Sequence, residues 1–211
     1  MQPFARADKI RKMLQKIYPE VKTQLLHRSP FELLVATILS AQCTDKQVNQ
    51  VTPLLFKRFR TPADFARAPL GAIERLIRPT GFFHNKARNI KSCAKAVLEK
   101  HNGEVPQSIA ELVKLPGVGR KTANVVLGAA FGIPGVVVDT HVARISQRLG
   151  LTTNKDATKI EFDLMKILPR RAWNDFSLQL IFFGREICLA RKPKCPVCPL
   201  KRLCPWPLKF L

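Results

Sequence analysis

The octapeptide LPGVGRKT occupies residues 115–122 and joins two predicted helices. Gly117, Val118 and Gly119 form a tight turn, and Arg120 and Lys121 follow in the first turn of the second helix. Backbone N–H groups in such a turn can approach an anion closely, and the helix N-terminus adds a partial positive charge. We expect the turn to bind phosphate and Lys121 to deliver an amine beside it. The alternative is a loop between two core helices with a solvated lysine.

Signals for helices recur along the chain. Ser29-Pro30-Phe31-Glu32 predicts a capping box that opens an apolar helix through Leu39, and similar starts occur at Thr44, Thr61 and Ser108. Further helices are predicted over 5–17, 69–78, 120–131, 139–149 and 173–188, and apolar residues recur at helical spacing in 90–98 and 160–168. Only Val136–Val138 is strand-like, and three residues make no sheet. The predicted fold class is all-α.

The charge of the chain points to a polyanionic partner. Its 211 residues carry 36 Lys and Arg against 15 Asp and Glu, a formal net charge of +21, with basic residues spread along the sequence. Such a balance favours nucleic acid as the partner, with an anionic membrane surface as the competitor. Residues 122–138 form the longest uncharged stretch, which is glycine-interrupted and shorter than the roughly 20 residues of a membrane span.

No apolar segment typical of a secretory signal follows Met1. We therefore expect a cytoplasmic protein, associated with the nucleoid in a prokaryote, with no membrane partner and a monomeric state. In a reducing compartment cysteines favour metal ligation over disulfides.

Four of the six cysteines gather near the C-terminus. Cys188, Cys195, Cys198 and Cys204 have the spacing C-x6-C-x2-C-x5-C. One C-x2-C pair flanked by single cysteines suits an iron–sulfur cube better than the paired C-x2-C knuckles of structural zinc. Zinc and two disulfides remain the alternatives. Cys43 and Cys93 are predicted to be core thiols at apolar helical positions.

Lysines stand inside the same cysteine segment. Lys192 and Lys194 precede the C-x2-C pair, and Lys201 and Arg202 follow it. A metal-organised loop with several cations is typical of a phosphate-contacting surface. We expect Lys192 and Lys194 to contact DNA.

These motifs together resemble the endonuclease III family of helix-hairpin-helix DNA glycosylases. The resemblance is carried by the hairpin with Lys121, by VDTHV at 138–142 with Asp139, and by the cysteine spacing. It extends through SPFELLVATILSAQCTD (29–45), TGFFHNKARNI (80–90), HNGEVP (101–106) and FGREICLARKPKCPVC (183–198). No single motif decides the assignment, but their combination is specific.

The resemblance implies two helical domains with a DNA-binding cleft between them. Residues 22–133 would form a six-helix barrel with the helix-hairpin-helix at about 108–131. Residues 1–21 and 134–211 would form the cluster domain, with one [4Fe-4S] cluster held in loop 188–204. Lys121 and Asp139 would face each other in the cleft.

The resemblance also implies an activity, excision of oxidised pyrimidines from duplex DNA followed by cleavage of the abasic site. Lys121 would form a Schiff base with the sugar and drive β-elimination on the 3′ side. Asp139 would stabilise the positive charge that develops on the sugar, or cap the helix that begins at Thr140, or do both. His141 is expected to bind phosphate or make a structural hydrogen bond. The general base for elimination is unassigned.

Base excision requires nucleotide flipping, which leaves a gap in the stack. By the family analogy Gln42 would fill the gap and Phe82 would wedge between base steps. Gln42 could instead cap the helix that ends near Ala41, and Phe82 could be a core aromatic with Phe83 as the wedge.

Three other functions compete with this one. The adenine mismatch glycosylases share the cluster and hairpin but lack a lysine at the position of Lys121. A glycosylase for pyrimidine dimers or mismatched uracil or thymine on the same scaffold differs only in its base pocket. A non-catalytic DNA-binding module with a redox-sensing cluster would form no covalent DNA adduct.

Overall fold

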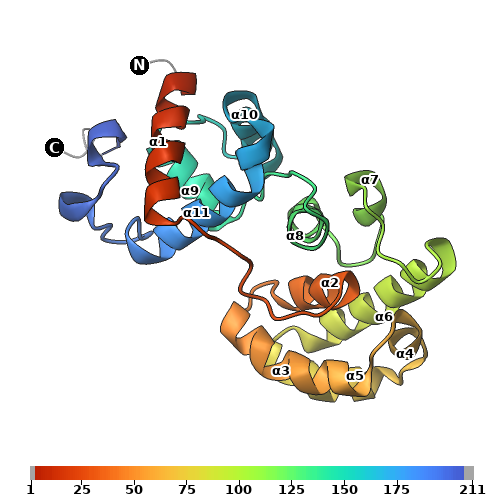
Figure 1. Ribbon diagram of the computed structural model, residues 1–211. Helices are drawn as coiled ribbons and strands as arrows, with labels where there is room; N and C mark the ends of the chain where they lie inside the picture. Colours follow the sequence, from red (N-terminus) through yellow and green to blue (C-terminus); the bar gives the residue numbers. More distant parts are fainter. Residues whose placement is uncertain (1–2, 207–211) are drawn as a thin grey trace. The chain divides into compact units, whose positions relative to one another are not determined.

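The computed structural model describes residues 3–206 and is helical throughout, with no strand in this range (Figure 1). The α-helices are α1 (Pro3–Ile17), α2 (Pro30–Leu39), α3 (Asp45–Arg58), α4 (Pro62–Arg67), α5 (Leu70–Ile77), α6 (Phe83–Lys100), α7 (Ile109–Leu112), α8 (Arg120–Phe131), α9 (Thr140–Arg148), α10 (Ala157–Ile167) and α11 (Trp173–Glu186). Short 3₁₀ turns are η1 (Arg78–Thr80), η2 (Arg170–Ala172), η3 (Cys195–Val197) and η4 (Lys201–Leu203). The predicted all-α class is confirmed.

Residues predicted to begin helices act as helix N-caps in the structure. Ser29 Oγ accepts a hydrogen bond from the backbone N–H of Glu32 at 3.2 Å, with Pro30 in the first turn. The Glu32 carboxylate accepts from the N–H of Arg28, one residue before the position that a capping box requires. Thr61 and Asp64 form the complete reciprocal box at the start of α4.

The chain divides into two compact units. One comprises Thr23–Ile133 and is called the hairpin unit here; the other comprises the residues up to Lys22 and from Pro134 onward and is called the cysteine unit. Each unit has its own hydrophobic core.

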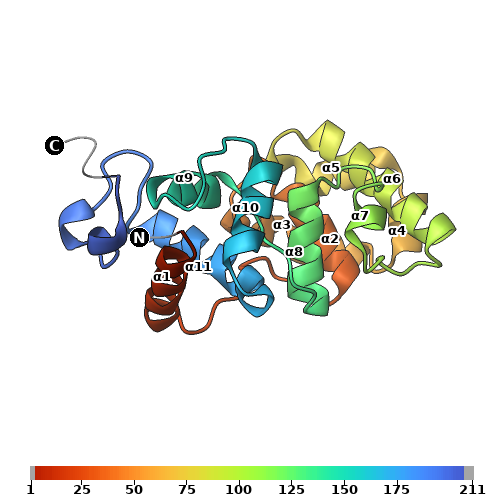
Figure 2. The same ribbon diagram turned by 90° about the horizontal axis from the view of Figure 1, so that it is seen from above.

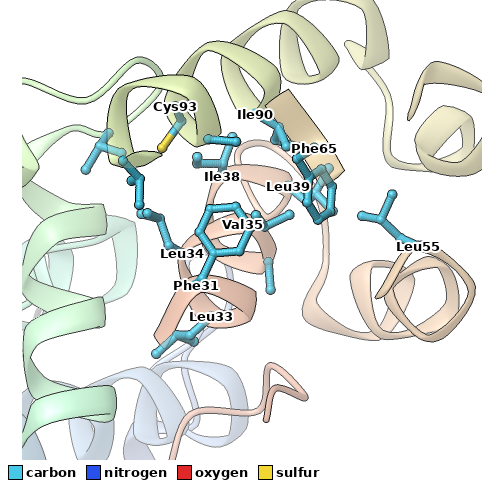
Figure 3. Close-up of a cluster of buried hydrophobic side chains, with 14 of the residues drawn as sticks. Phe31, Leu33, Leu34, Val35, Ile38, Leu39, Leu55, Phe65, Ile90 and Cys93 are labelled. Atoms are coloured by element: carbon cyan, nitrogen blue, oxygen red, sulfur yellow. The ribbon is translucent and has the colours of Figure 1, made fainter. Parts of the chain in front are cut away.

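Helix α2 is the central element of the hairpin unit. Eight of its ten residues are buried, and it contacts α3, α6 and α8. A helix that is apolar on all sides belongs in the middle of a helical core. Figure 3 shows its side chains meeting Phe65 of α4, Leu55 of α3, and Ile90 and Cys93 of α6. Cys93 is the predicted core thiol, and burial raises its pKa to about 12.

The cysteine unit is built on α11. This helix contacts α1 and α9, and α10 contacts both α1 and α9 (Figure 2). The segment Val136–Val138 is buried without forming a strand, and the N–H of Val137 donates to Ser177 Oγ at 3.0 Å. That segment leads directly into Asp139. No helix in residues 3–206 is both long and apolar enough to cross a membrane.

Candidate active site and DNA-contacting loops

The hairpin of LPGVGRKT is held by its own apolar residues. Leu115 and Val118 are 3% and 6% exposed, and the N–H of Val118 donates to the carbonyl of Leu115 at 3.1 Å. Gly117 has φ +77°, and a Cβ there would lie 2.9 Å from Asn89 Cβ on α6. Both the conformation and the space therefore require glycine at this position.

The start of α8 offers its backbone N–H groups to solvent. Gly119 is the exposed N-cap and supplies no side-chain cap. The first N–H groups of a helix have no intrahelical acceptor, so an anion can take that place. Lys121 is the second residue of α8, and its side chain is exposed. The side chain of Lys121 is thus accessible, beside the turn that the sequence predicts to bind phosphate.

Asp139 is the N-cap of α9. Its Oδ1 accepts from the N–H of Val142 at 2.8 Å, so the predicted capping bond is confirmed. The bond fixes the carboxylate through one oxygen and leaves Oδ2 for another role. Lys121 lies in the hairpin unit and Asp139 in the cysteine unit. That the two face one another stays a prediction from the resemblance.

His141 follows on the first turn of α9 and is half-buried. Burial lowers its pKa, and the positive charges of Arg144 and Arg185 lower it further, against an opposing effect of Asp139. Its Nδ1 lies 3.2 Å from Arg144 Nη2. A Cβ on Gly184 of α11 would lie 2.7 Å from that same nitrogen, so α9 and α11 pack closely here. These contacts favour the structural role for His141.

The four C-terminal cysteines surround one cavity. Cys188, Cys195, Cys198 and Cys204 all line a space of about 20 Å³, together with Arg148 and other residues of the cysteine unit. All four are free thiols in this structure. Within residues 3–206 no three His, Cys, Asp or Glu side chains are placed to hold a metal ion. Four soft sulfur donors around a shared cavity are nevertheless the donor set that an iron–sulfur cluster requires.

The surroundings of this cavity are cationic. Arg148 Nη1 lies 3.4 Å from Cys188 Sγ, and its guanidinium stacks on Trp206 at 4.2 Å. Burial raises the pKa of the Cys198 and Cys204 thiols above their ordinary value. Lys192 and Lys194 are exposed on the same loop, and Lys192 has φ +49°.

Two arginines bind α9 to the cysteine loop, which comprises residues 188–204. Arg144 Nη2 donates to the carbonyl of Cys188 at 2.8 Å and to that of Gly184 at 3.3 Å. Arg148 donates to the carbonyls of Leu189 and Ala190 at 2.7 and 3.0 Å. Helix α9 therefore presents Asp139 at one end and binds the cysteine loop along its length.

The two residues expected to enter the DNA stack share an unusual backbone. Gln42 and Phe82 have φ +51° and +48°, a region that L-residues with side chains rarely adopt. Both are exposed, Phe82 at 63%. Such strain tends to collect at functional turns.

The structure disfavours the alternative roles considered for Gln42 and Phe82. Helix α2 ends at Leu39 with Ser40 as its C-cap, so Gln42 does not fill that role. Phe83 is partly buried against the core, which leaves Phe82 as the outward aromatic.

Cys43 lies in a half-buried turn and not in a helix, so its predicted helical position is wrong.

Comparisons with known proteins extend over nearly the whole chain. Residues 35–170 match the HhH-GPD superfamily of base excision DNA repair proteins. Endonuclease III of Synechocystis sp. is 54% identical over 201 residues, which cover 95% of this chain and 92% of the relative. Endonuclease III of Bacillus subtilis is 48% identical, with 89% and 86% covered. This chain belongs to the endonuclease III family.

Solved structures of endonuclease III agree with that assignment. A non-covalent endonuclease III–DNA complex and a trapped endonuclease III–DNA covalent intermediate match with TM-scores of 0.94 and 0.95. Each is 47% identical and covers 100% of this chain and 99% of the other. As an endonuclease III family member, the chain is a base excision DNA repair enzyme.

Some residues of the site were absent from the sequence interpretation. Arg144 and Arg148 stand four residues apart after VDTHV, a spacing that places both on one face of a helix. Gly184 lies inside a segment that carries the resemblance, but no residue near it in the sequence indicates its close contact with His141 of α9. That contact joins residues that are far apart in the sequence.

Proposed function

We propose that this chain excises oxidised or otherwise damaged pyrimidines from duplex DNA and then cleaves the abasic site, with Lys121 as nucleophile. Two observations support this most directly. An exposed lysine stands in the first turn of α8, directly after the turn at Gly117–Gly119, and the chain is 47% identical to an endonuclease III trapped covalently on DNA. A reaction that passes through a covalent DNA adduct needs a nucleophile, and an exposed lysine amine is a suitable one.

The proposed first step is attack of the Lys121 Nζ lone pair on C1′ of the flipped nucleotide. The bond between C1′ and the base breaks, and the base leaves with the electron pair. Positive charge develops on the sugar, and Asp139 Oδ2 stabilises it while Oδ1 remains on the helix cap. The attacking nitrogen then loses a proton, the C1′–O4′ bond breaks, O4′ takes up a proton, and an imine forms between Lys121 and C1′.

The second step cleaves the strand. The imine acidifies the C2′–H bond, a base removes that proton, and the 3′ phosphate leaves with the electrons of its C–O bond. Hydrolysis of the imine releases Lys121. One amine thus serves both the glycosylase and the lyase step.

DNA binding is assigned to the hairpin and to two insertion turns. The N–H groups around Gly117–Arg120 bind backbone phosphate, as a helix N-terminus does. Gln42 fills the gap left by the flipped nucleotide, and Phe82 wedges into the stack. Exposed Lys192 and Lys194 bind phosphate from the cysteine loop, and the net charge of +21 favours the duplex throughout.

Cys188, Cys195, Cys198 and Cys204 would hold one [4Fe-4S] cluster, because they line one cavity beside a cationic side chain. When bound, this group supplies a rigid four-point crosslink for the loop and takes no part in the steps above. Residues 22–133 are assigned as the six-helix barrel domain, and 1–21 with 134–211 as the cluster domain. A monomer bound to chromosomal DNA, hence at the nucleoid of a prokaryote, is the expected state.

The proposal is tested on a panel of duplexes that each carry one defined damaged base. Products are read with and without alkaline cleavage, which separates base excision from strand nicking. The wild-type protein is expected to nick the strand without alkali. Lys121→Ala is expected to carry out both base excision and strand nicking at less than about 1% of the wild-type rate. Lys114→Ala is the matched control, since Lys114 is an exposed lysine of the same hairpin that pairs with Glu111 at 2.7 Å. A Lys121→Ala variant that nicks as well as Lys114→Ala would contradict the proposal.

A further inference from the structure

Lys86 is the only lysine in residues 3–206 that is buried. It lies on the first turns of α6 and is 4% exposed. Burying an ammonium group costs free energy unless a partner compensates for the lost water. Burial lowers the pKa of Lys86, and the mechanism above gives this group no task.

The contacts of Lys86 bracket the Phe82 turn. Its Nζ donates to the carbonyl of Thr80 at 2.8 Å, and its backbone N–H donates to the carbonyl of Phe82 at 3.0 Å. Between these carbonyls stands Gly81 with φ +69°, and Phe82 follows with φ +48°. The second bond is the ordinary backbone bond of the first turn of α6, so the lysine side chain adds the bond to Thr80, on the N-terminal side of the strained turn that exposes Phe82.

We propose that Lys86 is a positioning residue for DNA insertion, one that fixes the Phe82 turn through the Thr80 carbonyl without touching DNA. This inference rests on the proposed function of the same loops. A buried cation that clamps a strained turn costs stability and supports function. Its removal should therefore separate stability from activity.

The test compares Lys86→Met with Lys91→Met. Methionine keeps the length of the side chain and removes the charge. Lys91 is the matched control because it lies on the same helix, and its Nζ donates to another loop carbonyl, that of Ala68, at 2.7 Å. The probe is a duplex with a preformed abasic-site analogue opposite 2-aminopurine, whose fluorescence reports the stacking of the orphan base at saturating protein.

Lys86→Met removes the cost of burying a charge but also removes the lysine donor of the Thr80 carbonyl, so its melting temperature is expected to change little. Its kcat/KM for nicking a duplex abasic site is expected to fall by about 10-fold or more, since a misplacement of about 1 Å can cost about 100-fold. The fluorescence change on binding should be lost. Lys86→Arg, which keeps a charged donor, should restore part of it, and Lys91→Met should leave both signals as in the wild type.

Two results overturn the proposal. One is a Lys86→Met protein with wild-type fluorescence change and nicking. The other is a Lys86→Met protein that no longer folds cooperatively, which would make the lysine a structural requirement. Failure of the proposed function looks different, because Lys121→Ala would then still nick DNA. If the proposed function holds, Lys121→Ala loses nicking and keeps the fluorescence change.

Discussion

The hairpin at 115–121 and the cysteine loop at 188–204 both present cations, but they are held in different ways. In the hairpin, Leu115 and Val118 are buried in a core built around α2. In the cysteine loop, Leu200 is the only buried side chain, and arginines of α9 hold the backbone instead. The hairpin is shaped by apolar packing, whereas the loop is held by polar bonds.

The difference suggests a division of labour. A nucleophile must be held within a fraction of an ångström, and close apolar packing provides that rigidity from the chain alone. A loop with almost no buried side chains does not keep one conformation by packing alone, because too little apolar surface is buried to offset its conformational entropy. The proposed metal ligation would supply the missing free energy.

The largest expected effect follows from breaking the cysteine loop. Cys198→Ser should lose the cluster and destabilise the cysteine unit by about 4 kcal/mol or more. Hydrogen exchange should rise across 188–204 and stay unchanged at 115–121. Cys43→Ser, a half-buried cysteine outside the loop, is the control and should leave the visible iron–sulfur absorbance intact. Equal exchange in both regions would contradict the comparison.

The second prediction concerns the packing of the hairpin. Gly117→Ala should destabilise the protein by about 2–3 kcal/mol, because φ is +77° and the new Cβ meets Asn89 at 2.9 Å. Gly119→Ala is the control, since nothing lies within 4 Å of a Cβ there. Chemical denaturation of the two variants measures the difference. Equal stability would show that the turn tolerates a side chain and is not fixed by packing.

The arginine contacts give a smaller effect. Arg148→Met should lose the bonds to Leu189 and Ala190 and the stack on Trp206, at a cost of about 2 kcal/mol. Exchange should again rise in the cysteine loop and not in the hairpin. Arg170→Met, at an exposed position in η2, should cost less than about 0.5 kcal/mol. If the two variants had the same stability and the same hydrogen exchange in the loop, Arg148 would not stabilise the cysteine loop.

The smallest effect is a pH dependence within the cysteine unit. Hydrogen bonds from Thr152 and Asn154 lower the pKa of Asp163 below 3.8. A lowered carboxyl pKa adds stability above pH 3.8 that is lost as the pH falls through the lowered pKa. Asp163→Asn should cost about 1 kcal/mol at pH 7 and flatten the stability curve below pH 4. An unchanged dependence of stability on pH would show that the bonds of Thr152 and Asn154 to Asp163 do not stabilise the cysteine unit.

Much of this molecule could be predicted from sequence where the signal is local. Ser29, Thr61 and Ser108 begin helices as their caps indicate, and the spacing of the four cysteines predicts their shared cavity. Asp139 caps α9 as its position before Thr140 suggests.

Other features depend on tertiary neighbours and could not be predicted. The need for glycine at 184 comes from His141 and Ile145, some 40 residues away in the chain. The burial of Lys86 and the exposure of Phe82 are decided by packing, since both residues occur in one short polar and aromatic stretch. Cys43 was misplaced because the chain turns between the end of α2 at Leu39 and the start of α3 at Asp45.

The most direct test of the central claim is to locate the covalent bond to DNA. A duplex with an abasic site is incubated with the wild-type protein and borohydride, and the reduced adduct is digested and mapped by mass spectrometry. The account predicts a single modified residue, Lys121, and no adduct with Lys121→Ala under the same conditions. An adduct on another lysine, or an undiminished yield from Lys121→Ala, would contradict it.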